Sequence, residues 1–283
     1  MSNNLEQLKR YNFKFKKSLG QNFLFDTNIT DKIAKHSLPL SNTVIEIGPG
    51  AGTLTKSILK LNVNKIILIE KDKSLIKLLQ DLKEKNDSVE IYNKDALNFP
   101  IWKLGIGPRE IIANLPYNIS TKILINLLKN SSQFTKLTMM FQKEVANRII
   151  ARPGTRNYGR LSVITQLKTK VKILFDIPDT AFFPKPKVQS SLVQFIPYEN
   201  KKHNFVFEGS IPLIDLCRVL DLPKDRFDAV DGESDTLAGL VLELAGKFLD
   251  KGEVIIYEEF TFMVESTDQR KIIRVKITIN PKK

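Results

Sequence analysis

Three polar side chains follow predicted strands at positions where they could hold one nucleoside-type ligand. Glu70 closes the strand 65–70, Asp95 closes the strand 89–95, and Asn114 lies near the end of a later one. A carboxylate after the second strand can accept hydrogen bonds from ribose hydroxyls, and one after the third could meet an adenine amine. Because ligands of open α/β sheets bind beyond the strands' carboxyl ends, one shared crevice is expected. Alternatively, Glu70 could be a surface carboxylate and Asp95 could cap the next helix.

A glycine-rich loop precedes these residues. The stretch "EIGPGAGTLT" (46–55) places Gly48, Gly50 and Gly52 at alternate positions between a predicted strand and a predicted helix. Glycine lets the backbone turn tightly and approach a ligand closely, and a helix start adds amide donors. The spacing is G-x-G-x-G rather than the dinucleotide pattern G-x-G-x-x-G, so a dehydrogenase fits poorly. By itself the loop could be a simple strand–helix turn; together with Glu70 it predicts a nucleoside site.

The stretch "NLPY" indicates which chemistry the site performs. The side-chain oxygen of Asn114 and the carbonyl of Leu115 can accept hydrogens from an adenine amine, which keeps electron density on its nitrogen. Pro116 has a fixed φ and no N–H, so it helps to aim these carbonyls. Tyr117 offers a ring on which a flipped base can stack. The alternative is a proline turn that ends a strand beside a core tyrosine.

The surrounding pattern alternates strands with helices, which predicts a parallel, doubly wound α/β sheet. The strands are expected at 43–48, 65–70, 89–95, 110–117, 136–141, 170–177 and 190–197. The helices are expected from Asp26 onward and at 53–61, 72–85, 120–130, 144–151 and 161–169. The last two strands could close the edge of the sheet as an antiparallel pair.

The pattern changes near residues 200–206. A short strand, two short helices and then consecutive strands up to about residue 279 predict a small α+β module with its own apolar segments. We therefore predict two domains, 1–200 and 201–283, which suits a chain of 283 residues.

The charge of the chain is unevenly distributed. The net charge is +13, but residues 201–283 hold 13 basic and 15 acidic side chains, which leaves 31 basic and 16 acidic ones in residues 1–200. This asymmetry suggests a polyanionic partner for the first part, although solubility alone could also explain it. Lys14, Lys16 and Lys17 alternate with aromatic residues and predict a basic arm or a solvated terminus.

Several classes of protein are disfavoured by composition. The single cysteine, Cys217, cannot form an internal disulfide, and with His36 and His203 it makes no metal-ligand spacing, so no metal is expected. No apolar run reaches the roughly 18 residues that a membrane span needs. The first residues, "MSNNLEQLKR", lack the apolar segment of a secretory signal. We expect a cytoplasmic protein.

Residues 8–198 resemble the S-adenosylmethionine-dependent rRNA adenine dimethyltransferases, the KsgA group. The resemblance rests on "SLGQNFL" (18–24), "EIGPGAGTLT" (46–55), "NLPYNIS" (114–120), "FQKEVANRI" (141–149), "YGRLSV" (158–163) and "AFFPKPKV" (181–188). It implies a Rossmann-like methyltransferase domain, followed here by the small α+β domain.

The resemblance assigns roles residue by residue. It implies that the cofactor S-adenosylmethionine is bound by Asn22, Leu24, Gly48, Gly50, Glu70, Asp95 and Asn114. It implies that the target adenine is held by Asn114, Leu115, Pro116, Tyr117 and Phe182. The expected phosphate contacts are Lys14, Lys16, Lys17, Arg152, Arg156 and Arg160, although each alone is more often a solvated surface charge.

The implied reaction is direct in-line methyl transfer to the amines of two adjacent adenines near the 3′ end of small-subunit (16S) rRNA, during ribosome assembly. It needs no metal and no covalent intermediate, since positioning and amine polarisation supply most of the catalysis. The expected partner is the small ribosomal subunit, and the protein is expected to be a monomer.

The resemblance stops near residue 200, where the family normally continues with a helical, basic domain. Residues 205–278 instead resemble the CorC/HlyC transporter-associated domain, through "FEGSIPLIDLCRVLDL", "DTLAGLVLELAGKFLDKGEVI" and "RKIIRVKI". A fusion or chimera of two unrelated segments is expected, with an unusual natural tail as the alternative; the tail's partner is unknown. Two other functions stay open: a large-subunit rRNA methyltransferase of macrolide-resistance type, or an adaptor with impaired activity.

Overall fold

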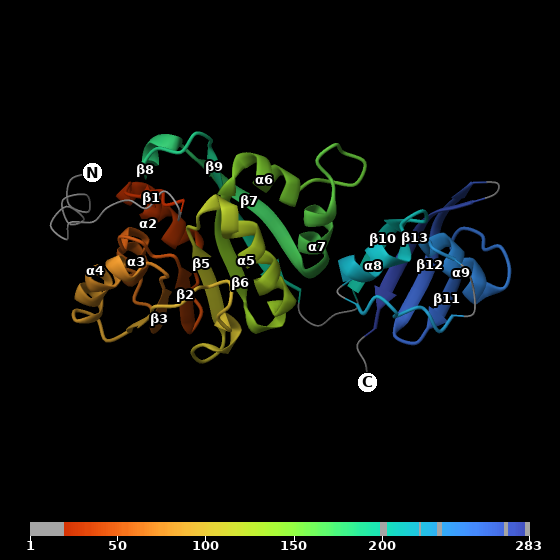
Figure 1. The fold of residues 1–283 in the computed structure, drawn as a ribbon, viewed down its shortest axis with the longest axis horizontal. Coiled ribbons are helices and arrows are strands. Elements are labelled where there is room, and N and C mark those ends of the chain that lie inside the picture. Colours follow the sequence, from red (N-terminus) through yellow and green to blue (C-terminus); the bar gives the residue numbers. More distant parts are fainter. Residues whose placement is uncertain (1–19, 199–202, 221, 231–233, 269–270, 281–283) are drawn as a thin grey trace. The chain divides into compact units, whose positions relative to one another are not determined.

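The computed structural model describes residues 20–198, 203–220, 222–230, 234–268 and 271–280. The chain divides into two compact units, Met1–Pro197 and Tyr198–Lys283 (Figure 1). Among the described residues, none of the helices has both the length and the apolar character needed to cross a bilayer. Each unit is described separately below.

The first unit is built on a seven-stranded sheet with the order β4-β3-β2-β5-β6-β9-β7. Its strands are β2 (Thr43–Ile47), β3 (Lys65–Ile69), β4 (Val89–Tyr92), β5 (Arg109–Ala113), β6 (Lys136–Gln142), β7 (Thr169–Ile177) and β9 (Ser190–Pro197). The first five of these pair in parallel, whereas β9 is antiparallel to both β6 and β7. The predicted α/β sheet is confirmed, and so is the antiparallel pair at its edge.

Helices cover both faces of this sheet (Figure 1). They are α2 (Thr27–His36), α3 (Thr53–Leu59), α4 (Lys73–Lys83), α5 (Tyr117–Lys129), α6 (Lys143–Ile149) and α7 (Arg160–Lys168), with short 3-10 turns at Ile101–Lys103, Ser131–Gln133 and Asp179–Ala181. Successive residues of a strand point to opposite faces. In β2, Val44 therefore packs in the cluster that contains residues of α2 and α3, while Ile45 and Ile47 pack in the cluster of α5.

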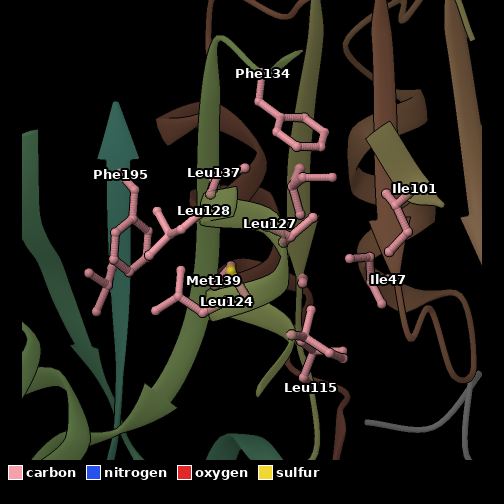
Figure 2. Packing of buried hydrophobic residues seen from close by; sticks show 14 of the residues in the cluster. Ile47, Ile101, Leu115, Leu124, Leu127, Leu128, Phe134, Leu137, Met139 and Phe195 are labelled. Atoms are coloured by element: carbon pink, nitrogen blue, oxygen red, sulfur yellow. The ribbon is translucent and has the colours of Figure 1, made fainter. Parts of the chain in front are cut away.

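The cluster on the α5 face is the larger of the two. Leu124, Leu127 and Leu128 of α5 meet buried side chains of the strands, with Phe134 and Leu115 at opposite ends of the cluster (Figure 2). Leu115 is part of the predicted site, so the wall of the site is also part of this core.

The connection between β5 and α5 differs from the prediction. A strand was expected to continue to residue 117 and a helix to begin at 120, but β5 ends at Ala113 and α5 begins at Tyr117. Pro116 is the N-cap residue of α5, and its carbonyl accepts hydrogen bonds from the N–H groups of Ile119 and Ser120. Only three residues therefore join the strand to the helix. Leu115 precedes the proline and so favours an extended backbone, which is consistent with a helix that begins after Pro116.

A two-stranded ribbon was not predicted. β1 (Phe23–Leu24) pairs antiparallel with β8 (Phe182–Phe183), so that Phe23 lies opposite Phe183 and Leu24 lies opposite Phe182. Strands of two residues are too short for any periodic pattern, and only the tertiary fold brings these segments together.

The second unit is the predicted α+β module. Its antiparallel sheet has the order β10-β13-β12-β11. The elements are β10 (His203–Glu208), α8 (Leu213–Leu220), α9 (Leu237–Ala245), β11 (Val254–Tyr257), β12 (Phe260–Asp268) and β13 (Lys271–Ile279). Phe227, Phe260 and Phe262 are buried and their rings contact one another.

The first unit contains a buried ion pair at the amino ends of β5 and β6. The carboxylate of Glu110 is fully buried, and Lys136 Nζ lies 3.0 Å from its Oε2. The N–H of Ser41 donates to Glu110 Oε1 over 3.1 Å, and the Lys136 ammonium also donates to the backbone carbonyls of Ser37 and Pro39. Burial raises the pKa of Glu110, and the neighbouring Lys136 opposes that rise. The pair therefore joins the chain before β2 to the sheet.

Replacing Lys136 with Met is expected to lower the free energy of unfolding by about 3–5 kcal/mol, because the Glu110 carboxylate is then buried without its counter-ion. Urea denaturation measures this change. Lys65→Met is the matched control: it breaks the exposed pair with Glu90 and should change stability by less than about 1 kcal/mol. Adding Glu110→Gln to Lys136→Met should restore part of the loss. Equal effects of the two lysine substitutions would contradict this account.

Candidate active site

An open cavity lies at the carboxyl ends of β2, β3, β4 and β5. Cavities at this edge of an open α/β sheet are common binding sites for small molecules. The lining of this cavity contains all the residues predicted to bind the cofactor and four of those predicted to hold the base: Asn22, Leu24, Gly48, Gly50, Glu70, Asp95, Asn114, Leu115, Pro116 and Tyr117. The structure thus brings together residues that are up to 95 positions apart in the chain.

The glycine loop forms the floor of the cavity. Gly48 and Gly50 have φ values of 70° and 58°, in the left-handed region that other residues rarely adopt. A Cβ atom on Gly48 would lie 3.4 Å from the carbonyl oxygen of Asn114, and one on Gly50 would lie 2.7 Å from the ring of Phe23. Both positions therefore require glycine, because of the backbone conformation and because of the close neighbours.

Glu70 is a buried carboxylate, with 7% of its surface exposed, so the alternative of a surface carboxylate is wrong. Its Oε2 accepts a hydrogen bond from the N–H of Gly50 over 3.2 Å, and its Oε1 accepts one from the N–H of Asp72 over 2.8 Å. Burial raises the pKa of Glu70, and these amide donors oppose the rise. Each carboxylate oxygen has a second acceptor position, so Glu70 can order the loop and still bind ribose hydroxyls.

Asp95 has partners for both oxygens. Oδ1 accepts a hydrogen bond from the N–H of Leu97 over 3.0 Å, and Oδ2 lies 2.7 Å from Lys71 Nζ. The hydrogen bond from Lys71 lowers the pKa of Asp95. Asp95 therefore both caps the turn that follows it and lines the cavity. Its contact with an adenine amine remains a prediction.

The residues of "NLPY" present different groups to the cavity. Asn114 is half-buried, and no hydrogen bond joins its side-chain amide to another residue within the described parts of the chain. Leu115 is buried in the core, while Tyr117 is half-buried and its Oη lies 2.6 Å from Ser190 Oγ. Burial raises the pKa of the Tyr117 phenol, so it stays neutral at physiological pH. The Asn114 amide is thus available to a ligand.

Phe182 is placed apart from the other predicted base-binding residues. It is 4% exposed, packs in the cluster that contains Leu24 and Ile33, and is absent from the cavity lining given above. Its neighbour Phe183 is 42% exposed. Stacking of a base on Phe182 therefore stays a prediction that needs the side chain to become accessible.

The predicted phosphate contacts fall into two groups. Arg152, Arg156 and Arg160 are exposed and lie between the end of α6 and the start of α7. Lys14, Lys16 and Lys17 lie outside the described residues.

Two further cavity residues were not assigned a role by the sequence. Gln21 Nε2 donates to Asp72 Oδ2 over 2.9 Å, which connects the segment before β1 to the start of α4. Glu46 is buried in β2, and its Oε2 accepts a hydrogen bond from Thr55 Oγ1 over 2.6 Å. Burial, together with the charge of Glu70, raises the pKa of Glu46 to about 8. A charged residue inside the apolar strand "TVIEI" was the signal that could have identified it.

Comparison with solved structures shows that the first unit has the fold of a methyltransferase. The chain is similar to the crystal structure of a dimethyladenosine transferase from Plasmodium falciparum, with 32% identity, 62% of this chain and 63% of that chain covered, and a TM-score of 0.55. It also shares its fold with the 23S rRNA methyltransferase ErmE, with 24% identity, 62% and 70% coverage and a TM-score of 0.53.

Sequence comparison shows to which family of methyltransferases the chain belongs. A Ribosomal RNA small subunit methyltransferase A from Rhodospirillum rubrum is 44% identical over 68% of this chain and 67% of its own length. The protein of the same name from Wolbachia pipientis wMel is 45% identical over 75% of this chain and 74% of its own length. Residues 12–207 match the family described as Ribosomal RNA adenine dimethylase. The chain belongs to this family.

The remainder of the chain matches a different family. Residues 198–281 match the one described as Transporter associated domain, CorC/HlyC. The two matches overlap at residues 198–207, directly after the end of the first compact unit at Pro197.

The buried Glu46 predicts a pH-dependent stability. Its folded pKa of about 8 is above the ordinary value of 4.5, so the folded protein retains a proton that the unfolded chain releases between these pH values. The free energy of unfolding should therefore fall as pH rises through this window, by at most roughly 1.4 kcal/mol per pH unit. Glu46→Gln should make the dependence between pH 6 and pH 8 shallower.

Urea denaturation at several pH values tests this expectation. Glu90→Gln is the control, because Glu90 lies at the surface and its pKa is lowered by a hydrogen bond from Lys65. Its contribution is constant between pH 6 and pH 8. A Glu46→Gln variant with the wild-type slope would show that Glu46 is ionised in the folded protein.

Proposed function

We propose that this protein transfers methyl groups from S-adenosylmethionine to the exocyclic amines of two adjacent adenines near the 3′ end of small-subunit (16S) rRNA during ribosome assembly. The observation that supports this most directly is the "NLPY" segment, in which Asn114 and Tyr117 both line the cavity and the Asn114 side-chain amide has no hydrogen bond to any residue that the structure describes. Relatives named small subunit methyltransferase A support the choice of subunit.

The cavity fits the proposed cofactor. Gly48 and Gly50 let the loop turn tightly against Asn114 and Phe23 at the cavity, and the buried Glu70 offers acceptors for ribose hydroxyls. The residues proposed to hold the cofactor are Asn22, Leu24, Gly48, Gly50, Glu70, Asp95 and Asn114. S-Adenosylmethionine supplies an electrophilic methyl group on a sulfonium.

The protein's own groups prepare the nucleophile. An adenine amine is a poor nucleophile, because its lone pair is delocalised into the ring. The Asn114 side-chain oxygen and the Leu115 carbonyl accept the amine hydrogens, which favours electron density on nitrogen. Tyr117 holds the flipped base by stacking, so that the amine has a fixed orientation. Orientation and preorganised dipoles supply most of the rate enhancement.

RNA phosphates are proposed to bind to positively charged side chains of the first unit that lie outside the cavity. Exposed arginines at positions 152, 156 and 160 are proposed to contact phosphates, together with Lys14, Lys16 and Lys17. The excess of basic residues before residue 200 supports this arrangement. Such phosphate contacts provide affinity for the RNA and fix its position on the protein, while the cavity selects the base.

We propose that residues 1–200 form the methyltransferase domain and that residues 201–283 form a separate module. The two compact units and the two family matches support this division. Because residues 201–283 carry two more acidic than basic side chains, this module does not add to RNA binding by charge. An adaptor role for the module, with reduced methyltransferase activity, is the competing proposal.

Full-length protein, S-adenosylmethionine and undermethylated small subunits provide the test. Mass spectrometry of the digested rRNA should detect dimethyladenosine in small subunits and none in separately treated large subunits. Calorimetry should show that the protein binds S-adenosylmethionine, and Glu70→Ala should weaken binding by about tenfold or more, since it removes acceptors for ribose and the support of Gly50.

Glu90→Ala serves as a surface control and should leave both measurements unchanged. Modification of the large subunit instead would favour the macrolide-resistance type. Cofactor binding without any methylation would favour the adaptor. Absence of binding, or binding indifferent to Glu70→Ala, would refute the proposed cofactor site.

A further inference from the structure

The ring of Tyr117 is held at both ends. Its backbone begins α5 directly after Pro116, and its hydroxyl lies 2.6 Å from the hydroxyl of Ser190, which is 73 positions away in the chain. Tyr117 lines the cavity, whereas Ser190 is completely buried and begins β9. The hydrogen bond therefore connects a group in the site to a residue that no ligand can reach.

Ser190 is a rigid anchor because of its place in the sheet. It pairs with Gln142 at the end of β6 on one side and with Ile177 at the end of β7 on the other. β9 is thus an interior strand, and its first residue has strand partners on both sides. A side chain whose support is fixed in this way keeps a functional group in one geometry.

A tyrosine ring without such a bond would have more freedom. The hydroxyl oxygen lies on the long axis of the ring, so a hydrogen bond there restricts χ1 and fixes where the far end of the ring lies. Burial raises the pKa of Tyr117, so the phenol remains a neutral partner for the Ser190 hydroxyl over the physiological pH range. The direction of the ring's long axis, and with it the place where a base would stack, is therefore set by β9.

We infer that Ser190 is a positioning residue for methyl transfer, which fixes the direction of the Tyr117 ring and thereby the position of the target adenine. This inference rests on the proposed function, in which Tyr117 stacks on the base. Ser190 does not contact the base, so its effect is on the reacting geometry rather than on binding of the RNA. Small errors in that geometry reduce the rate of a reaction that depends on alignment.

The neighbouring serine is a matched control. Ser191 is also completely buried, but its hydroxyl donates to Asp176 Oδ1 over 2.7 Å. Asp176 in turn lies 2.6 Å from Lys143 Nζ. Ser191→Ala therefore removes a hydrogen bond of a buried serine from the same strand without changing the support of Tyr117.

Steady-state kinetics of the full chain on undermethylated small subunits test the inference. Ser190→Ala and Tyr117→Phe should each lower kcat by about fivefold, the effect of one neutral hydrogen bond, with little change in KM for the subunit. The double variant should be no slower than the slower single variant, because both changes remove the same bond. Ser191→Ala should keep the wild-type kcat, even if its melting temperature falls.

A spectroscopic measurement separates this inference from the proposed function. In protein labelled with ¹³C at tyrosine Cζ, the Tyr117 resonance is identified by its loss in Tyr117→Phe. It should shift in Ser190→Ala and stay in place in Ser191→Ala. This readout needs no activity, so it tests the anchor even if the wild-type protein fails to methylate the subunit.

Four results would overturn the inference. They are a wild-type kcat in Ser190→Ala, losses that multiply in the double variant, an equal loss of kcat in Ser191→Ala, or an unshifted Tyr117 resonance in Ser190→Ala. Since Tyr117→Phe removes the same bond from the accessible end, the test stands even if Ser190→Ala unfolds.

Discussion

The site depends on the buried carboxylate of Glu70, because this one group connects the glycine loop to the start of α4. It accepts hydrogen bonds from the amides of Gly50 and Asp72, and Asp72 then caps α4 through Ser74 and accepts a hydrogen bond from Gln21. A carboxylate taken out of water is destabilising unless such donors surround it. The loop, the helix start and the segment before β1 are therefore ordered together, and each of them lines the cavity.

Buried acids have different partners at the two ends of the sheet. At the amino ends, Glu110 is matched by Lys136 and serves to join segments of the fold. At the carboxyl ends, Glu46 and Glu70 lie near each other with hydroxyl and amide donors but without a lysine or arginine paired to either in the described structure. An acid without a counter-ion is costly in the folded protein, and it is also the kind of group that a polar ligand can engage. The ion pair that joins segments of the fold and the acids that line the cavity therefore lie at opposite ends of one sheet.

Most of the fold could be predicted from the sequence, because short apolar runs such as those of β2 and β3, which are buried along nearly their whole length, are separated by helical patterns. The position of the cavity could also be predicted, since Glu70, Asp95 and Asn114 each follow a strand and parallel strands end at one edge of the sheet. The sequence did not indicate which partners these groups have. The contacts of Asp95 with Lys71 and of Tyr117 with Ser190 join residues 24 and 73 positions apart, and no local pattern encodes them. The burial of Phe182 was missed for a similar reason, as it follows from the unpredicted pairing of β1 with β8.

The position of β9 has a consequence for how the protein is made. β9 is the last strand of its sheet in the sequence, yet it lies between β6 and β7. A nascent chain that ends before Ser190 therefore lacks an inner strand rather than an outer one, and both neighbours present unpaired backbone groups. At roughly 5–20 residues per second, β9 is completed about one to four seconds after β7. During that interval the edge of β6 is open and β7 lacks the strand with which it pairs, and the second unit is synthesised only after β9.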